Sequence, residues 1–594
     1  HNIVIIATEN DSVYAFDADT GSVLWQTSML ADGAQPIPSA DAKNSMGTSC
    51  GDLTPLIGIT STPVIDPATG TLFLVAATKE ADQSYVFRLH ALDIATGGEQ
   101  SRSPVVIQGS VASNGPNAAN GKISLSALIN HQRSALLLDR GIIYMAFSSH
   151  CDFGAYNGFV AGYNETSLSQ VALFSDAPNG TEAGIWMSGG GLASDASGDI
   201  YLSTGNGTFD ANSGGADYGD TLLRLTPAGN SFSVTSYFTP SNQADLSNAD
   251  QDLGSGAILL LPDQPQGPAH LALGMGKEGV IYLVNRDAMG GYQQGVNGSD
   301  QVIQEISGFN GLFGSAAYFN NNVYLVPASG MPVQFSLNGG LLSNTPVATF
   351  PQGFAFPGAT PSISANGGND GIFWMIGNSG TAVLCAFNAS NIANELYNSS
   401  QNALRDSAGP FNKFQVPTIA NGKVYVATQT QLAVYGLLSG PGPTPTGSAT
   451  PTPMPTAANV VTVTHVIAGT AHPGGVRNGG TFMLNNATGA AETINAVTIS
   501  FSDPAMFKSA ALNAVHALAS RRAKATPPLT QTTFTFKSAL KLPANKKATF
   551  RLVFTPIKGA TLPSTQVVTG IGSSWTGVTQ GLPATLGSVS PPSN

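Results

Sequence analysis

The stretch Val13-Tyr14-Ala15-Phe16-Asp17-Ala18-Asp19-Thr20-Gly21-Ser22-Val23-Leu24-Trp25 reads as a strand, a turn and a second strand. Val, Tyr and Phe favour strands, whereas Asp and Thr-Gly favour turns. The pattern returns at Leu89-His90-Ala91-Leu92-Asp93-Ile94-Ala95-Thr96-Gly97. A hairpin that recurs along one chain indicates a repeat architecture.

Short apolar strands recur outward from this stretch, with starts spaced about 50 to 70 residues apart. Eight such strands begin at Val4, Leu72, Ile142, Ile200, His270, Val323, Ile372 and Val424. Most follow a turn and precede a second apolar strand. Repeated units of three or four strands predict a β-propeller over residues 1–438. We expect eight blades, or seven if the terminal units share one blade.

Composition supports an all-β, extracellular protein. The 594 residues include 68 Gly, and charged residues make up 10%, against ~25% in an average soluble domain. The composition excludes coiled coils and intrinsic disorder. No apolar run reaches the length of a membrane-spanning helix, so no membrane span is expected.

The repeats end at a Pro/Thr-rich tract over residues 439–458, which predicts an extended linker. Short alternating strands return in residues 459–594 and suggest an immunoglobulin-like sandwich. The Ala-rich residues 505–526 are expected to form a helix or long loop inserted in it.

Charge divides the chain in two. Residues 457–594 carry a net +9 and residues 1–456 a net −20. The basic part is expected to seek an anionic polymer, a cell surface or the acidic body of a neighbouring copy. The alternative is that both charges only keep the chain in solution. An acidic propeller does not suggest nucleic-acid binding.

The two hairpin stretches resemble the repeat of pyrroloquinoline-quinone (PQQ) propellers, in which the Thr-Gly turn and the Trp dock one blade onto the next. Residues 1–438 also resemble secreted bacterial PQQ-like proteins, at Gly184-Ile185-Trp186-Met187-Ser188-Gly189-Gly190-Gly191, Tyr201-Leu202-Ser203-Thr204-Gly205-Asn206-Gly207-Thr208-Phe209-Asp210 and residues 416–425. The resemblance implies a first blade strand before His1, so the N-terminal blade is expected to be incomplete.

Quinoprotein alcohol dehydrogenases of this superfamily stack the quinone between a Trp and two adjacent, disulfide-bonded cysteines, and they hold calcium with Glu, Asn and Asp. This chain has no adjacent cysteines and no Cys-x-x-Cys-His haem motif. No quinone-binding residue of that family is therefore assigned in this chain. PQQ and calcium both remain candidate cofactors. Candidate calcium ligands are Asp17 with Asp19, and Asp210 with Asp217 and Asp220.

In a propeller, the loops that enter the first strand and those that leave the second strand of each blade open on the same face. We expect the polar residues of these loops to surround a central funnel. The candidates are Lys79, Glu80, Arg133, His150, Asp152, Trp186, Asn206, Asp210, Tyr218, Asp252, Lys277 and Glu278. His150 and Asp152 are candidate acid and base, and Trp186 or Tyr218 can stack on a sugar ring. The alternative is that these residues only cap turns.

The same topology brings Cys50 and Cys151 to one face of adjacent blades, which predicts a disulfide and an oxidising compartment. Cys385 lies in an apolar strand and is expected to be a buried thiol.

Three functions remain open. The favoured one is a secreted, non-catalytic binding or assembly protein that uses the basic module to attach the propeller to a surface, a polymer or another copy. The second is a PQQ- and calcium-dependent dehydrogenase of sugars or alcohols. The third is a polysaccharide-active enzyme with a C-terminal binding module.

Overall fold

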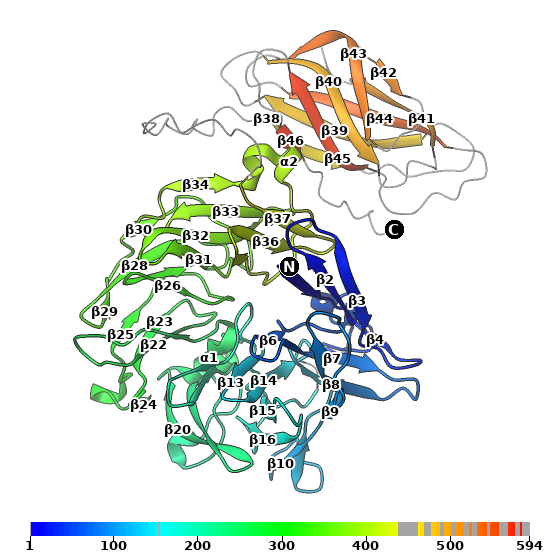
Figure 1. Cartoon of the computed structure of the whole chain (residues 1–594). Helices are drawn as coiled ribbons and strands as arrows, with labels where there is room; N and C mark the ends of the chain where they lie inside the picture. The colour runs from blue at the N-terminus through cyan, green and yellow to red at the C-terminus, as the bar shows by residue number, and fades with distance from the viewer. Residues whose placement is uncertain are drawn as a thin grey trace. The chain divides into compact units, whose positions relative to one another are not determined.

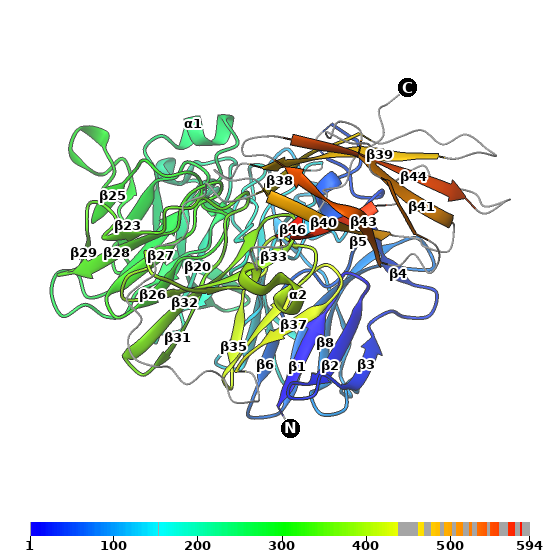
Figure 2. The ribbon, with the colours of Figure 1, turned by 90° about the horizontal axis from the view of Figure 1, so that it is seen from above.

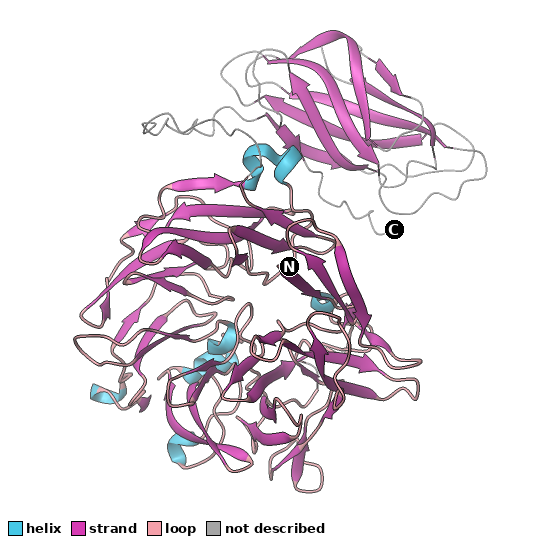
Figure 3. Cartoon of the chain, in the orientation of Figure 1, coloured by secondary structure: helices cyan, strands magenta, loops and turns pink. Residues whose placement is uncertain are grey.

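The computed structural model describes residues 2–44, 46–152 and 154–437 in full, and the backbone of the strands between 461 and 584. The chain divides into two compact units, His1–Leu437 and Leu438–Asn594. The regular structure of the first unit is mainly strands, joined by loops and a few short helices (Figure 3).

Eight sheets follow one another around a ring in the first unit (Figure 1). Blade 1 contains β1 (Ile3–Ala7), β2 (Ser12–Asp17) and β3 (Val23–Ser28); blade 2 contains β4 (Gln35–Pro38), β5 (Leu56–Ile57), β6 (Val64–Asp66), β7 (Thr71–Lys79), β8 (Tyr85–Asp93) and β9 (Val105–Ile107). A hairpin of β10 (Ser110–Ala112) and β11 (Lys122–Ser124) follows. Blade 3 contains β12 (Asn130–His131), β13 (Leu137–Asp139), β14 (Ile142–Ser149), β15 (Phe159–Asn164) and β16 (Gln170–Ser175).

The other five blades follow along the chain. Blade 4 contains β17 (Ala193–Ser194), β18 (Ile200–Ser203), β19 (Leu222–Ala228), β20 (Ser231–Thr239) and β24 (Gly291–Tyr292); blade 5 contains β21 (Leu259–Leu260), β22 (Leu271–Met275), β23 (Ile281–Asn285) and β25 (Gln304–Ile306). The exception to this order is β24, which pairs in parallel with β20 of blade 4 but lies in the chain between β23 and β25 of blade 5. Blade 6 contains β26 (Ala317–Phe319), β27 (Asn322–Leu325), β28 (Val333–Asn338), β29 (Leu341–Leu342) and β30 (Ala348–Thr349). Blade 7 contains β31 (Ser362–Asn366), β32 (Asn369–Asn378), β33 (Ala382–Asn388) and β34 (Glu395–Asn398); blade 8 contains β35 (Thr418–Ala420), β36 (Lys423–Ala427) and β37 (Leu432–Tyr435).

The strands form because apolar and β-branched residues run along them and both faces are covered by neighbouring blades. In β7, for example, eight of the nine residues are buried. The apolar clusters contain residues of successive blades, so the core of the unit lies between the blades. The eight strands predicted from the repeat spacing are β1, β7, β14, β18, β22, β27, β32 and β36.

The hairpin that first indicated the fold docks blade 1 onto blade 2. The indole N–H of Trp25 donates to the carbonyl of Ile94 at 3.0 Å, and the Thr27 hydroxyl donates to the carbonyl of Gly97 at 2.9 Å. A Cβ at Gly97 would lie 2.4 Å from the indole, and its φ is +70°. Only glycine therefore fits this contact without strain.

Blades 1 and 8 close the ring as separate three-stranded sheets, which confirms eight blades and rules out the shared seventh blade. Lys423 of β36 forms an ion pair with Asp19, and Asn421 bonds Asn2 at 3.0 Å. In Figure 2, the N-terminus lies at one face of the ring and α1 (Gln243–Asn248) lies at the opposite face.

Helices in the described residues are short and lie in connections. Besides α1 they are α2 (Ala403–Asp406) and the 3-10 turns η1 (Gly51–Leu53), η2 (Ala211–Ser213), η3 (Leu253–Ser255), η4 (Val296–Gly298) and η5 (Ser399–Asn402). None of the helices described has the length and hydropathy needed to span a membrane.

The strands of the second unit form two sheets, with orders β38-β39-β44-β41-β42 and β43-β40-β45-β46. They are β38 (Val461–Ile467), β39 (Arg477–Asn486), β40 (Glu492–Phe501), β41 (Phe507–Ala514), β42 (Arg522–Ala525), β43 (Gln531–Leu542), β44 (Lys547–Pro556), β45 (Val568–Trp575) and β46 (Leu582–Ala584). Strands β41 and β42 replace the helix or long loop expected within 505–526. The immunoglobulin-like assignment stays a prediction, and the linker 439–458 lies outside the described residues.

Candidate ligand site at the loop face

We call one face of the ring the loop face. It is the face at which the chain enters the first strand of each blade and leaves the second strand. Blades 3, 4 and 5 bring six predicted residues together there: Arg133, Asp152, Trp186, Asn206, Asp252 and Lys277. We call these six residues, together with Tyr156, Glu182 and Asp250, the axial cluster.

Asp252 is the most connected carboxylate of the axial cluster. It directly precedes η3, and its side chain is only 6% exposed. One oxygen lies 2.6 Å from Lys277 Nζ, and Oδ1 accepts the backbone N–H of Asn206 at 2.8 Å. Burial raises the pKa of Asp252, and the charge of Lys277 limits that rise.

Gly205 allows the indole of Trp186 and the carboxylate of Asp252 to meet. A Cβ at Gly205 would lie 2.2 Å from Asp252 Oδ1 and 2.7 Å from Trp186 Nε1. The indole Nε1 is buried and has no hydrogen-bond partner among the described residues, and the same holds for Asn206 Oδ1. A buried polar atom without a partner costs free energy, so both atoms have unused bonding capacity at this point.

Arg133 lies between two aromatic rings. Its guanidinium carbon is 5.8 Å from the centre of the Trp186 ring and 4.7 Å from that of Phe414. Nη2 donates to the Ser188 hydroxyl at 2.6 Å. Burial lowers the pKa of Arg133 to about 10, although the charges of Asp52 and Asp252 oppose this shift.

Sequence reasoning missed three members of the axial cluster. The Tyr156 hydroxyl donates to Asp152 at 3.0 Å, and its ring meets Trp186 edge-on at 6.3 Å. Asn206 Nδ2 reaches Glu182 at 3.4 Å, and Asp250 bonds Lys277 at 2.9 Å. Burial raises the pKa of both Asp152 and Glu182, and the charge of Asp152 adds to the rise at Glu182. Tyr156, Glu182 and Asp250 lie in the same loops as Asp152, Trp186 and Asp252. This proximity in the sequence is the signal that could have predicted them.

Strained backbone surrounds this cluster. Positive φ occurs at Cys151 and Asp152, at the adjacent Glu182 and Ala183, and at Phe414. None of these is glycine, and left-handed backbone is unfavourable for side chains such as Ala, Glu and Phe. Strain of this kind is found preferentially at functional sites.

Several predicted funnel residues have structural roles instead. His150 is buried in blade 3, where Nδ1 bonds the Leu128 carbonyl at 3.1 Å and burial lowers its pKa to about 4. It is therefore not an acid–base partner of Asp152. Strand-end side chains alternate in direction, which turns His150 into the core.

Other candidates contact residues outside the axial cluster. Lys79 pairs with Asp41 at 2.8 Å, and Glu80 with Arg88 at 2.6 Å. Glu278 accepts from Tyr282 at 3.0 Å. Asp210 accepts the N–H of Asp217 at 2.9 Å, and the Tyr218 ring packs 5.5 Å from that of Tyr237.

The disulfide predicted from the topology joins Cys50 to Cys151, with Cα atoms 5.9 Å apart. Cys385 is a buried free thiol. In the described part of the chain, no three His, Cys, Asp or Glu side chains gather to hold a metal ion. Calcium binding by Asp17 with Asp19, and by Asp210 with Asp217 and Asp220, stays a prediction.

No family model and no curated protein matches this chain. Solved structures with similar folds include the quinohemoprotein alcohol dehydrogenase from Comamonas testosteroni, at 12% identity and a TM-score of 0.44 over 71% of this chain and 68% of that one. Quinohemoprotein alcohol dehydrogenase ADHIIG from Pseudomonas putida HK5 has 12% identity, a TM-score of 0.43 and the same coverage. BamB from Moraxella catarrhalis has 12% identity and a TM-score of 0.41 over 73% and 96% of the two chains.

Proposed function

We propose that the propeller is a secreted binding protein whose axial cluster takes a small anionic organic ligand. The observation that carries this proposal is the environment of Arg133. Its guanidinium lies between two rings, and its described contacts include one hydroxyl and no ion pair with a carboxylate. Arg88, Arg224 and Arg286, by contrast, each form an ion pair.

The energetics favour an anion at Arg133. A guanidinium has five N–H donors, and holding it away from water without a carboxylate in direct contact costs free energy. A ligand carboxylate can accept two of these donors side by side and offset that cost. Trp186 and Phe414 fix the plane of the guanidinium and so reduce the entropy lost on binding.

A thermal-shift titration with acetate, succinate and benzoate tests this proposal. We expect at least one of these carboxylates to stabilise the wild-type chain and to lose its effect in Arg133→Gln. Arg102→Gln is the matched control, because Arg102 is exposed. Equal shifts in wild type and Arg133→Gln, or no shift with any carboxylate, would overturn the proposal.

We further propose that the basic residues 459–594 attach the propeller to an anionic surface, a polymer or the acidic body of another copy. The +9 and −20 division of charge supports this. The Cys50–Cys151 disulfide supports an oxidising, extracellular compartment. Sedimentation at increasing salt tests attachment between copies: complexes should dissociate as salt screens the charges. A chain that is monomeric at low salt and does not bind anionic polymers would contradict it.

A second candidate is a PQQ- and calcium-dependent alcohol or sugar dehydrogenase. It is favoured by Glu182, Asn206 and Asp252 around Trp186, because quinoproteins that this chain resembles use a Trp with Glu, Asn and Asp. The side-chain oxygens of these three residues suit calcium, because Asn206 Oδ1 is a buried acceptor without a partner in the described chain. The missing adjacent cysteines are the departure from that pattern.

In this second candidate, Glu182, Asn206 and Asp252 would hold calcium, and Trp186 would support the quinone. Bound there, the pair would supply a hydride acceptor and a Lewis acid. Lys277 Nζ lies 2.6 Å from one oxygen of Asp252 and holds that carboxylate in place. Titration with PQQ and calcium, followed by dye reduction with alcohols and sugars, tests it. Binding without dye reduction would leave only the binding function.

A further inference from the structure

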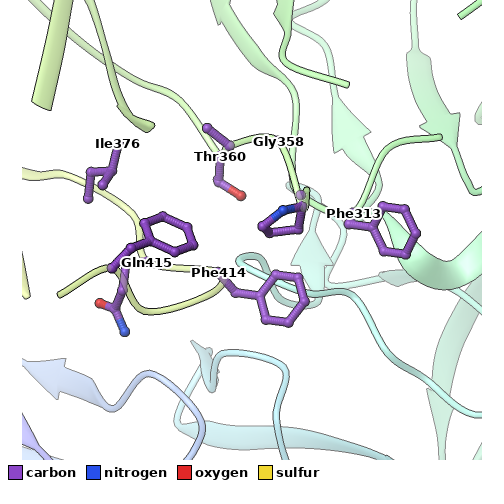
Figure 4. Close-up of a pocket in the computed structure, with 10 residues that line it drawn as sticks. Phe313, Gly358, Thr360, Ile376, Phe414 and Gln415 are labelled. Atoms are coloured by element: carbon purple, nitrogen blue, oxygen red, sulfur yellow. The ribbon is translucent and has the colours of Figure 1, made fainter. Parts of the chain in front are cut away.

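The loops of blades 6, 7 and 8 leave little internal space on the loop face. Figure 4 shows Phe313, Thr360 and Phe414, which line a pocket with room for about one water molecule. This pocket does not admit a larger partner. The outer edge of blade 8, by contrast, is open to one.

Blade 8 ends one strand short of the other blades. The strands equivalent to β37 are β2, β8, β15, β19, β23, β28 and β33, and each of them pairs with an antiparallel outer strand. Strand β37 pairs with β36 on one side, and no described strand pairs with its other side. Its outer edge is therefore free within the described part of the chain.

The missing neighbour leaves β37 uncovered. Each of the seven equivalent strands contains at least three buried residues. The four residues of β37 are all half-buried or exposed, and Val434 is 45% exposed. Leu, Ala, Val and Tyr are the residues of a covered strand rather than of a solvated one. Their exposure indicates a surface that another strand covers.

The hairpin between β36 and β37 decides which backbone groups point outward. The Thr428 N–H donates to the Gln431 carbonyl at 2.9 Å, so these two residues form a hydrogen-bonded pair. Such pairs alternate with non-hydrogen-bonded pairs along antiparallel strands. Along the register, the backbone groups of Ala433 therefore face β36, whereas those of Leu432 and Val434 face outward. These outward N–H and C=O groups can bond a further strand.

Exposed apolar side chains lie beside this free edge. Asp406 holds α2 against both β37 and β34: its backbone carbonyl accepts from Tyr435 at 2.7 Å, and its carboxylate accepts from Tyr397 at 2.8 Å. Leu404 of α2 is 97% exposed and Leu396 of β34 is 52% exposed. Apolar side chains next to an unpaired strand are typical of an interaction surface.

A second copy of the chain fits this edge. The neighbour that blade 8 lacks is an antiparallel strand, and a second β37 related by a two-fold axis is antiparallel and has the same spacing of outward groups. Residues 424–437 contain no charged residue and no proline, which are the usual means of keeping a sheet edge from pairing. Because residues 1–456 carry a net −20, two copies repel each other in general, and an uncharged edge is where they can approach.

We propose that the chain forms a symmetric homodimer in which the outer edges of two β37 strands pair and join the two blade 8 sheets into one. Backbone hydrogen bonds set the register, and the covered apolar area supplies affinity. This interface uses neither Arg133 nor the basic residues 459–594, so it is independent of the proposed function.

Sedimentation equilibrium of the full chain in about 1 M salt tests the interface, because the Debye length is then about 3 Å and attraction between charged surfaces is screened. We expect a dimer whose dissociation constant rises by about tenfold or more in Val434→Pro, since each copy loses an outward N–H donor. Proline is tolerated on an edge strand where the N–H faces solvent. Val434→Thr is the matched control, because it keeps the N–H and the branched side chain.

Thermal unfolding checks that each variant folds, and Val434→Lys gives a second test, since a lysine on an edge strand opposes pairing. A chain that is monomeric at every concentration overturns the proposal. A dimer that both Val434→Pro and Val434→Lys leave intact overturns the role of β37, and equal weakening in Val434→Thr and Val434→Pro overturns pairing through the backbone. An association that is lost in high salt would support attachment through residues 459–594 and contradict this interface.

Discussion

Asp52 and Lys413 form an ion pair of 2.6 Å although 361 positions separate them in the chain. Asp52 belongs to η1, directly after Cys50, and Lys413 precedes Phe414 in the loop that enters blade 8. The disulfide links the same segment to Cys151 of blade 3. The segment between β4 and β5 of blade 2 thus contacts the loop of Cys151 in blade 3 and the loop that enters blade 8.

We expect the disulfide to be the stronger of these two links. It closes a loop with a sequence separation of 101 residues, so replacing both cysteines by serine should lower the free energy of unfolding by about 2–4 kcal/mol. Asp52→Asn is the comparison and should cost less than about 1 kcal/mol, since Asp52 is 74% exposed. Urea unfolding measures both. A double-cysteine variant as stable as the wild type would contradict this.

Trp25 should contribute to stability through one specific hydrogen bond. Trp25→Phe keeps a ring against blade 2 but leaves the Ile94 carbonyl without this donor. We expect a loss of about 1 kcal/mol, measured by chemical unfolding. Val23→Ala on the same strand is the control, because Val23 is 59% exposed. A loss no larger than in the control would exclude a docking role for the indole N–H.

Gly205→Ala should disrupt the axial cluster. The added Cβ would meet Asp252 and Trp186 at less than 3 Å, so at least one of them must move. We expect a tenfold or greater loss of carboxylate binding and a change in tryptophan fluorescence. Gly51→Ala has open space around its Cβ and is the matched control. Unchanged binding in Gly205→Ala would show that the ligand does not depend on this arrangement.

Asp11 should make stability depend on pH. Burial, together with the charge of Glu9, raises the pKa of Asp11 from 3.8 to about 8. Between these two values the native state holds a proton that the unfolded chain has lost, so this group's contribution to stability falls as pH rises from about 4 to about 8. Asp11→Asn should remove that fall and should be more stable than the wild type near pH 8.5.

Thermal unfolding from pH 4 to pH 8.5 measures this effect. Asp32→Asn is the control, because Asp32 is exposed. Parallel stability curves for wild type and Asp11→Asn over that range would contradict the prediction.

Much of the fold was predictable because a blade is specified locally. Apolar strands and Thr-Gly turns recur in each unit, and the Trp25 contact repeats a known docking pattern. Topology then placed Arg133, Trp186, Asp252 and Lys277 on one face, since antiparallel strands carry alternate loops to the same end.

Side-chain direction at the ends of strands was not predictable. His150 and Asp152 are two positions apart, yet one lies in the core and the other faces Tyr156. The contact between Arg133 and Phe414 was missed because Phe414 looks like a core residue in an apolar-rich sequence. Only packing shows that its ring lies beside the guanidinium.

The most direct measurement of the central claim is a crystal structure of the full chain soaked with the carboxylate that gives the largest thermal shift. The account predicts the carboxylate within hydrogen-bond distance of Arg133. A carboxylate bound away from Arg133, or an empty site at a concentration that saturates the thermal shift, would contradict it.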